Sequence, residues 1–130
     1  MKQAHDISTS NRDRNRVAME AFFNLVEKWQ IDGVENKRKL LGQPPQSTFF
    51  KWQRGDVSNV PHDTIIRISY LMGIHKALKM LFSGNNERAY AWVKKPSIDL
   101  NGQSAYERML AGEVTDLAYV RNYLDTMRGM

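Results

Sequence analysis

A long apolar segment between Pro61 and the polar break at residues 83–86 constrains the fold more than any other part of the sequence. Its apolar residues recur at helical spacing and cover much of a helix circumference. They are Ile65, Ile66, Ile68, Leu71, Met72, Ile74, Leu78, Leu81 and Phe82. A helix that is apolar on most sides must be packed on several sides, so the segment predicts a central helix surrounded by other elements. Gly73 inside it is a candidate position for a bend, since glycine costs about 1 kcal/mol in a helix relative to alanine.

The other segments also have the spacing of amphipathic helices. We expect them at residues 14–30, 34–41, 46–54, 87–94, 104–111 and 114–127. Glycines at positions 42, 55 and 112 are helix-ending signals, and either Gln46 or Ser47 can cap the third helix. Ser104, with Glu107 three residues later, has the pattern of a capping box. No segment alternates apolar and polar residues as a strand does, so the predicted fold is all-α.

Length and composition narrow the possible functions. A chain of 130 residues is one domain, or two small helical modules that share a core. The absence of cysteine excludes disulfides and thiolate metal sites, and the three histidines lack metal-ligand spacing. We find no nucleophile and base pair and no Gly-rich phosphate loop, so we expect no catalytic residue, metal or cofactor. No apolar run approaches the roughly 20 residues of a membrane span, and residues 1–16 lack a secretory apolar core, so we expect a cytoplasmic protein.

Cations and aromatic residues gather in one window of the sequence. Between Asn36 and Arg54 there are five cations and no acid, namely Lys37, Arg38, Lys39, Lys51 and Arg54. The same window holds Phe49, Phe50 and Trp52. Because positions three or four apart share a helix face, Phe49 and Trp52 are predicted to point toward the core. Gln46, Ser47, Lys51 and Arg54 then lie around the other side, and Phe50 is intermediate.

Two short helices joined by a tight turn, the second carrying cations, are the ingredients of a helix-turn-helix DNA reader. Gln46, Ser47 and Thr48 could then reach base edges. Lys51 and Arg54 would contact phosphates, and Lys37 and Arg38 on the preceding helix would add backbone contacts. An ordinary core helix with a solvated basic face explains the same spacing, and a motif of this size does not exclude it.

The stretch FFKWQRG, followed by Pro61, resembles the Cro and phage-repressor type of helix-turn-helix. In that family the third helix has a Trp three residues before a Gly, and a Pro opens the next helix. The matching residues are Trp52, Gly55 and Pro61, and the resemblance covers residues 34–73. The turn at residues 43–46 is longer and stiffer than is usual for the family because it contains two prolines.

The C-terminal third contains a second set of characteristic residues, namely Trp92, Lys94, Lys95, Pro96, Gly102, Ser104, Glu107, Leu110, Ala111, Gly112, Val120, Arg121, Tyr123 and Leu124. In this order they resemble the toxin-binding domain of the Xre/MbcA/ParS antitoxins. Two positions depart from the usual pattern, Ser97 after the proline and Tyr106 after the capping serine. Many of these residues also have ordinary structural roles, as helix caps or as core.

The resemblance implies an antitoxin that docks on a cognate RES-domain toxin and blocks the entrance to the toxin's active site. RES-domain toxins consume NAD or modify a protein with ADP-ribose, so NAD would belong to the partner. The implied toxin contacts are Trp92, Lys95, Pro96, Arg121, Tyr123, Leu124, Asp125 and Arg128. The helix-turn-helix would repress the antitoxin's own operon by binding operator DNA. We also expect a homo-oligomer, most simply a dimer, and a hetero-oligomer with the toxin.

These expectations divide the chain into three parts. Residues 1–13 are predicted as a flexible tail, residues 14–62 as the helix-turn-helix module, and residues 63–130 as the toxin-binding and oligomerisation domain, with the central helix joining the last two. An alternative keeps the same N-terminal module in a stand-alone transcriptional regulator, whose C-terminal helices serve only to dimerise.

Overall fold

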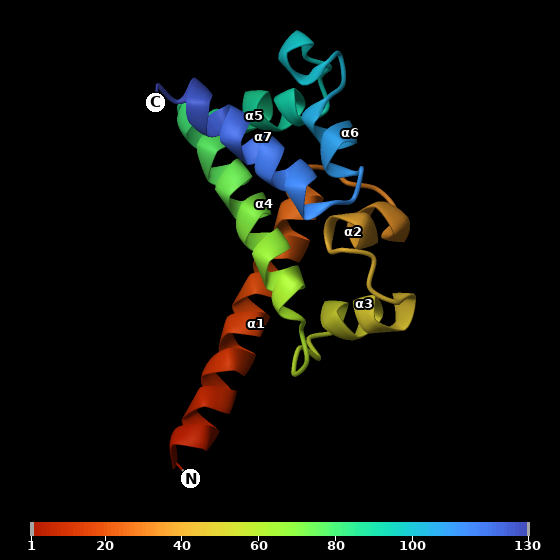
Figure 1. The fold of residues 1–130 in the computed structure, drawn as a ribbon, viewed down its shortest axis with the longest axis vertical. Helices are drawn as coiled ribbons and strands as arrows, with labels where there is room; N and C mark the ends of the chain where they lie inside the picture. Colours follow the sequence, from red (N-terminus) through yellow and green to blue (C-terminus); the bar gives the residue numbers. More distant parts are fainter. Residues whose placement is uncertain (1, 130) are drawn as a thin grey trace.

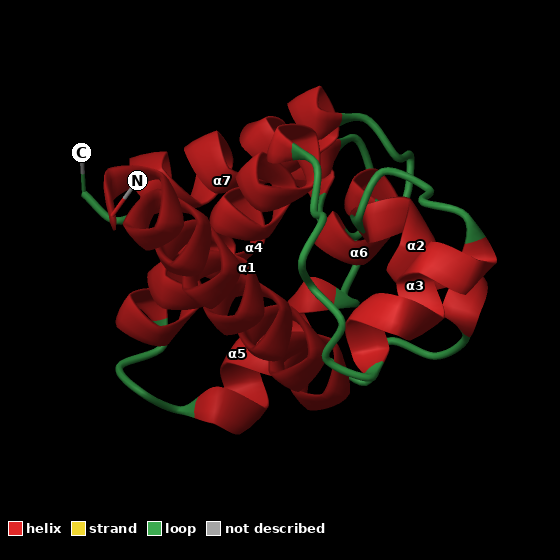
Figure 2. Ribbon diagram, turned by 90° about the horizontal axis from the view of Figure 1, so that it is seen from below, coloured by secondary structure: helices red, strands yellow, loops and turns green. Residues whose placement is uncertain are grey.

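The computed structural model describes residues 2–129, and within them the chain is all-α, as predicted, with helices and loops but no strand (Figure 2). The elements are α1 (Lys2–Lys28), α2 (Val34–Leu40), α3 (Gln46–Gln53), α4 (His62–Leu81), α5 (Asn86–Val93), the 3-10 turn η1 (Ile98–Leu100), α6 (Ala105–Met109) and α7 (Val114–Met127). The bounds of α2 to α7 lie within two residues of the predicted ones. None of the described helices combines the length and apolar character needed to cross a bilayer.

Helix α4 is central, as predicted, and packs against α1, α5 and α7 (Figure 1). Its buried residues are Thr64, Arg67, Ile68, Leu71, Ile74, Ala77 and Leu78. Pro61 is its N-cap, where the lack of a backbone N–H has no cost because that position precedes the hydrogen-bonded turns. The sides of α4 therefore supply the surface on which both halves of the chain assemble.

Helix α1 begins at Lys2, well before the predicted start at Arg14. Residues 2–32 contain neither glycine nor proline, so no residue interrupts a helix once its later turns are packed, and each added residue gains a hydrogen bond. The later turns bury Met19, Phe22, Leu25, Val26 and Trp29. The first half of α1 extends away from the other helices (Figure 1).

Contacts between distant segments join the two predicted modules. The ammonium of Lys94 donates a hydrogen bond to the carbonyl of Gln30 at 2.6 Å and lies 5.4 Å from the centre of the Tyr106 ring. The side-chain amide of Asn36 donates to the Tyr106 hydroxyl at 3.1 Å. In both ribbon views α2, α3 and α6 lie together on one side of α1 and α4 (Figures 1 and 2). The modules thus share one packed body.

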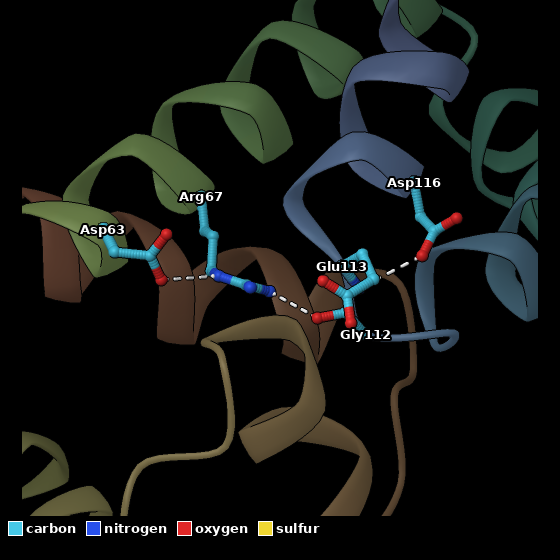
Figure 3. A network of polar contacts seen from close by, with 5 residues as sticks. All are labelled: Asp63, Arg67, Gly112, Glu113 and Asp116. Atoms are coloured by element: carbon cyan, nitrogen blue, oxygen red, sulfur yellow. Dashed lines mark hydrogen bonds and ion pairs between the residues drawn. The ribbon is translucent and has the colours of Figure 1, made fainter.

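A buried arginine connects three parts of this body (Figure 3). Arg67 is 8% exposed, and its Nε donates to the Asp63 carboxylate at 2.9 Å while one terminal nitrogen donates to the Gly112 carbonyl at 2.8 Å. A Cβ added to Gly42 would lie 2.9 Å from Arg67 Nε, and the φ of Gly42 is +90°, so only glycine fits there without strain. Arg67 therefore links the start of α4, the turn after α2 and the loop before α7.

Candidate functional surfaces

Helix α3 has one apolar side and one polar side. Phe49 is fully buried and Trp52 is 3% exposed, which confirms that both point into the core. The indole N–H of Trp52 donates to the carbonyl of Asn59 at 3.3 Å and ties α3 to the segment that leads into α4. The polar residues Gln46, Ser47, Lys51 and Arg54 are exposed, and Thr48 is half-buried. The exposed side of α3 thus carries two amide or hydroxyl side chains at one end and two cations toward the other.

Phe50, which the sequence left unassigned, is half-buried. Its ring meets the Phe49 ring edge to face, with the centroids 5.6 Å apart. Phe50 therefore belongs to the margin of the core rather than to the exposed side of α3.

The turn between α2 and α3 is held by Arg38, one of the residues predicted to contact DNA. Arg38 Nε donates to the carbonyl of Pro44 at 2.8 Å, and its guanidinium forms an ion pair with Glu35. The N-cap of α3 is Pro45, not Gln46 or Ser47, and no side chain caps this end. The helix begins directly after the two prolines of the turn. Gln46 and Ser47 are therefore not used as caps, and their side chains are exposed.

Lys37, the other α2 residue predicted to contact DNA, is half-buried. It lines a hollow of about 570 Å³ together with Asp32, Gln53 and Lys94. The lining residues of this hollow come from α1, the α1–α2 connection, α2, α3 and the residue after α5. Lys37 therefore lies beside this hollow and is only partly exposed.

The predicted toxin contacts lie at the end of α5, in the loop before α6 and on α7. The Trp92 and Tyr123 rings are stacked, with centroids 6.2 Å apart and planes 5° from parallel. The Tyr123 hydroxyl donates to the Asp99 carboxylate at 2.9 Å. Burial raises the pKa of Tyr123, and the hydrogen bond to Asp99 raises the pKa further because a phenolate could not donate it. Lys95 and Pro96, at the start of the loop, are exposed.

Charged residues lie along another side of α7, because Arg121, Asp125 and Arg128 are three or four positions apart while Tyr123 is two positions from Arg121. Asp125 forms ion pairs with two arginines one turn away on either side, with Arg121 at 3.6 Å and with Arg128, which also donates a hydrogen bond to it, at 3.5 Å. All three side chains are about a third exposed. Such a ladder contributes little to stability because solvent screens it, so its charges remain available to another molecule. We use the name α7 face for this whole region, which includes two sides of α7 and the loop before α6; its residues are Trp92, Lys95, Pro96, Arg121, Tyr123, Asp125 and Arg128.

Leu124 differs from the other predicted toxin contacts. It is 1% exposed and packs in the core with Leu117 and Val120, because the spacing of these three residues puts them on the side of α7 that meets α4. We therefore assign Leu124 to the support of the α7 face and not to its contacting surface.

The ends of α6 and α7 are fixed by polar side chains. Ser104 and Glu107 form the predicted capping box of α6, and Asp116 reaches back to the backbone N–H of Glu113 at 3.0 Å to cap α7 (Figure 3). Asp116 also accepts from Arg108 at 2.8 Å, and the Arg108 guanidinium lies 3.9 Å from the centre of the Tyr119 ring. These contacts set the direction in which α7 leaves the loop.

Sequence reasoning missed two residues of consequence. Arg67 was hidden within an apolar helix, although a cation among such residues is itself a sign of a buried partner. Ile98, at 94% exposure, is the most exposed of the large apolar side chains found on the described surface. In the sequence, Ile98 could have been noticed as a large apolar residue in a short loop of mostly polar and turn-forming residues.

Among the described residues, no group of three or more His, Asp or Glu could hold a metal ion.

Comparison with known proteins identifies the family of the C-terminal part of the chain. Residues 77–129 match the family described as the antitoxin Xre/MbcA/ParS C-terminal toxin-binding domain. The chain is also 41% identical over 124 residues to the uncharacterized protein y4oB of Sinorhizobium fredii (strain NBRC 101917 / NGR234), and the match covers 94% of each chain. The residues of the α7 face therefore lie within the range that matches the family.

Proposed function

This chain belongs to the Xre/MbcA/ParS antitoxin family through its C-terminal toxin-binding domain, and from that premise we propose that it neutralises a RES-type toxin and represses its own operon. The observation that carries the proposal is the match of residues 77–129 to the toxin-binding domain. An antitoxin acts by binding, and the proposal assigns the chain no catalytic role of its own.

The composition of the α7 face supports the docking of a protein there. Stacked Trp92 and Tyr123 offer a rigid aromatic surface, and aromatic residues with arginine are enriched at protein interfaces. Arg121 and Arg128, on another side of α7, add positive charge, with Asp125 between them. We propose that the toxin covers this face and that its active-site entrance is then blocked. NAD would be a substrate of the toxin, with no site on this chain.

The arrangement of α3 supports a role in reading operator DNA. Its core side fixes the helix through Phe49 and Trp52, while Gln46 and Ser47 at its N-terminal end are exposed for base edges. Lys51 and Arg54 are exposed as well, and we propose that they contact phosphates. Arg38 contributes by holding the turn through the hydrogen bond from its Nε to Pro44, and its guanidinium keeps further N–H donors for a contact with the DNA backbone.

Co-expression with the product of the adjacent gene tests the proposal. We expect the wild-type chain to co-purify with that protein, to rescue growth when the protein is toxic alone, and to restore cellular NAD if the toxin consumes it. Arg121→Glu combined with Arg128→Glu should weaken rescue, whereas Lys76→Glu, an exposed charge reversal on α4, should not. Failure of the wild type to bind or to rescue would instead favour a stand-alone transcriptional regulator with a C-terminal dimerisation domain.

A further inference from the structure

Ile98 presents a large apolar side chain to solvent from the loop between α5 and α6. It is 94% exposed, compared with 61% for Val17 and 53% for Met127, two other exposed large apolar residues. Single exposed apolar residues are common on protein surfaces and need no explanation by themselves. The case for Ile98 depends on how firmly the loop holds it and on what surrounds it.

The loop around Ile98 is fixed by hydrogen bonds on both of its sides. The backbone N–H of Ser97 donates to the carbonyl of Gln103 at 3.1 Å, and that of Gly102 donates back to the carbonyl of Ser97 at 2.8 Å. Leu100, two residues after Ile98, is fully buried and anchors the loop in the core. The loop thus closes on itself, and Ile98 stands at its tip.

A third attachment joins the loop to the α7 face. Asp99, directly after Ile98, accepts the hydrogen bond from the Tyr123 hydroxyl at 2.9 Å, and Tyr123 stacks on Trp92. The backbone at Ile98 is therefore attached to the aromatic pair through its neighbour Asp99. Because little loop freedom remains to be lost, a partner that covers Ile98 would have a low entropic cost of ordering it.

We propose that Ile98 is the apolar anchor of the toxin contact and enters an apolar pocket on the toxin, next to the surface that covers Trp92 and Tyr123. This inference rests on the proposed function and deepens it. Ile98 lies within residues 77–129, the part of the chain that belongs to the toxin-binding family, and it is continuous with the α7 face. A toxin without a matching apolar pocket would bind poorly, so Ile98 would also help to select the cognate partner.

The test uses the full-length chain and the product of the adjacent gene, purified as a complex and compared by binding titration. Ile98→Ala should weaken binding by about 30-fold, the typical loss at an interface hot spot. Ile98→Asp should weaken it further, because it places a charge in an apolar pocket. Val17→Asp is the matched control, since Val17 is an exposed apolar residue of α1 outside residues 77–129 and should leave binding unchanged.

Folding and self-association are measured on the same variants. Because Ile98 is almost fully exposed, both substitutions should leave the thermal midpoint and the mass of the isolated protein in light scattering unchanged. Wild-type affinity in both Ile98 variants would overturn the inference while leaving the proposed function intact. A lower mass for isolated Ile98→Asp would also overturn it, by assigning Ile98 to a contact between copies of this chain. If the wild type itself did not bind, the proposed function would fail first.

Discussion

The guanidinium of Arg121 on α7 lies against Gly73 on α4, in space that any other residue at position 73 would occupy. A Cβ built on Gly73 would come within 2.3 Å of a terminal nitrogen of Arg121, far closer than atoms approach in proteins. From this position Arg121 Nε lies 3.6 Å from Asp125. The absence of a side chain at Gly73 therefore leaves the space that the guanidinium of Arg121 occupies.

Gly73→Ala should separate stability from toxin binding. Alanine is favoured over glycine inside a helix by about 1 kcal/mol, and the atoms in its way belong to the flexible end of Arg121, which can move. We expect the free energy of unfolding in urea to be unchanged or to rise by up to about 1 kcal/mol. The affinity for the toxin should fall because Arg121 is displaced.

A double-mutant cycle checks that the loss acts through Arg121. Gly73→Ala should lower toxin affinity in the wild-type background but have little effect once Arg121 is replaced by alanine. Equal losses in both backgrounds would show that position 73 acts by another route, and a clear drop in stability would show that the helix cannot accept a Cβ there.

Arg67 should be among the polar residues on which stability depends most. Arg67→Met keeps most of the side-chain volume but leaves the Gly112 carbonyl without its donor, so we expect a loss of about 2 kcal/mol in the free energy of unfolding. Asp63→Asn is the control, because this side chain is 60% exposed and an amide oxygen can still accept from Arg67, so it should cost less than about 1 kcal/mol. Urea denaturation measures both, and equal losses would contradict the importance of the Gly112 contact.

Local patterns were enough to predict the helices from α2 to α7. Glycine, proline and the Ser104 capping box act within a few residues of where they occur, and the apolar spacing of α4 correctly predicted a central position. The same method could not predict the early start of α1. Residues 2–13 are mostly polar, and their apolar residues Ala4 and Ile7 are too few to show a helical period, although the segment contains nothing that stops a helix.

Such local patterns could not predict contacts between residues that are far apart in the sequence. The hydrogen bond from Arg67 to Gly112 joins residues 45 positions apart, and the one from Tyr123 to Asp99 spans 24. Which polar groups meet depends on how the helices pack, and no single segment carries that information. Leu124 shows the converse, since its motif implied a contact with the toxin while its helical spacing with Leu117 and Val120 placed it in the core.

Lys51 and Arg54 should determine the salt dependence of operator binding. If each contacts a phosphate, then replacing either by alanine removes about one counterion-release step and flattens the slope of log affinity against log salt by about one unit. Lys76→Ala is the control, because it removes the same charge from an exposed position on α4. Titrations of the fragment upstream of the gene at several salt concentrations give the slopes. Unchanged slopes in both α3 variants would show that α3 does not contact the DNA backbone.

His75 should make the protein less stable in mild acid. Burial lowers the pKa of His75 from its usual 6.5, and the nearby charges of Lys28 on α1 and Lys79 on α4 lower it further. Its ring is stacked on Tyr90 of α5 with the centroids 5.9 Å apart, and Trp29 lies on another side at 6.5 Å. Well above pH 6.5, from about pH 7.5 upward, both the folded and the unfolded chain hold a neutral imidazole, so His75 contributes no pH dependence there.

As the pH falls through 6.5, the imidazole of His75 is protonated in the unfolded chain before it is protonated in the folded chain. The free energy of unfolding therefore falls until the pH reaches the lower pKa of the folded chain. We therefore expect wild-type stability in urea to decrease from about pH 7.5 to about pH 5, and His75→Gln, which cannot titrate, to decrease less over this range. The informative quantity is the change in the free energy of unfolding between the two pH values. Any effect of glutamine on the packing against Tyr90 is the same at both pH values and does not enter this change. Carboxylates are common to the two proteins and cancel in the comparison. Parallel pH profiles would mean that His75 is protonated as easily in the folded chain as in the unfolded one.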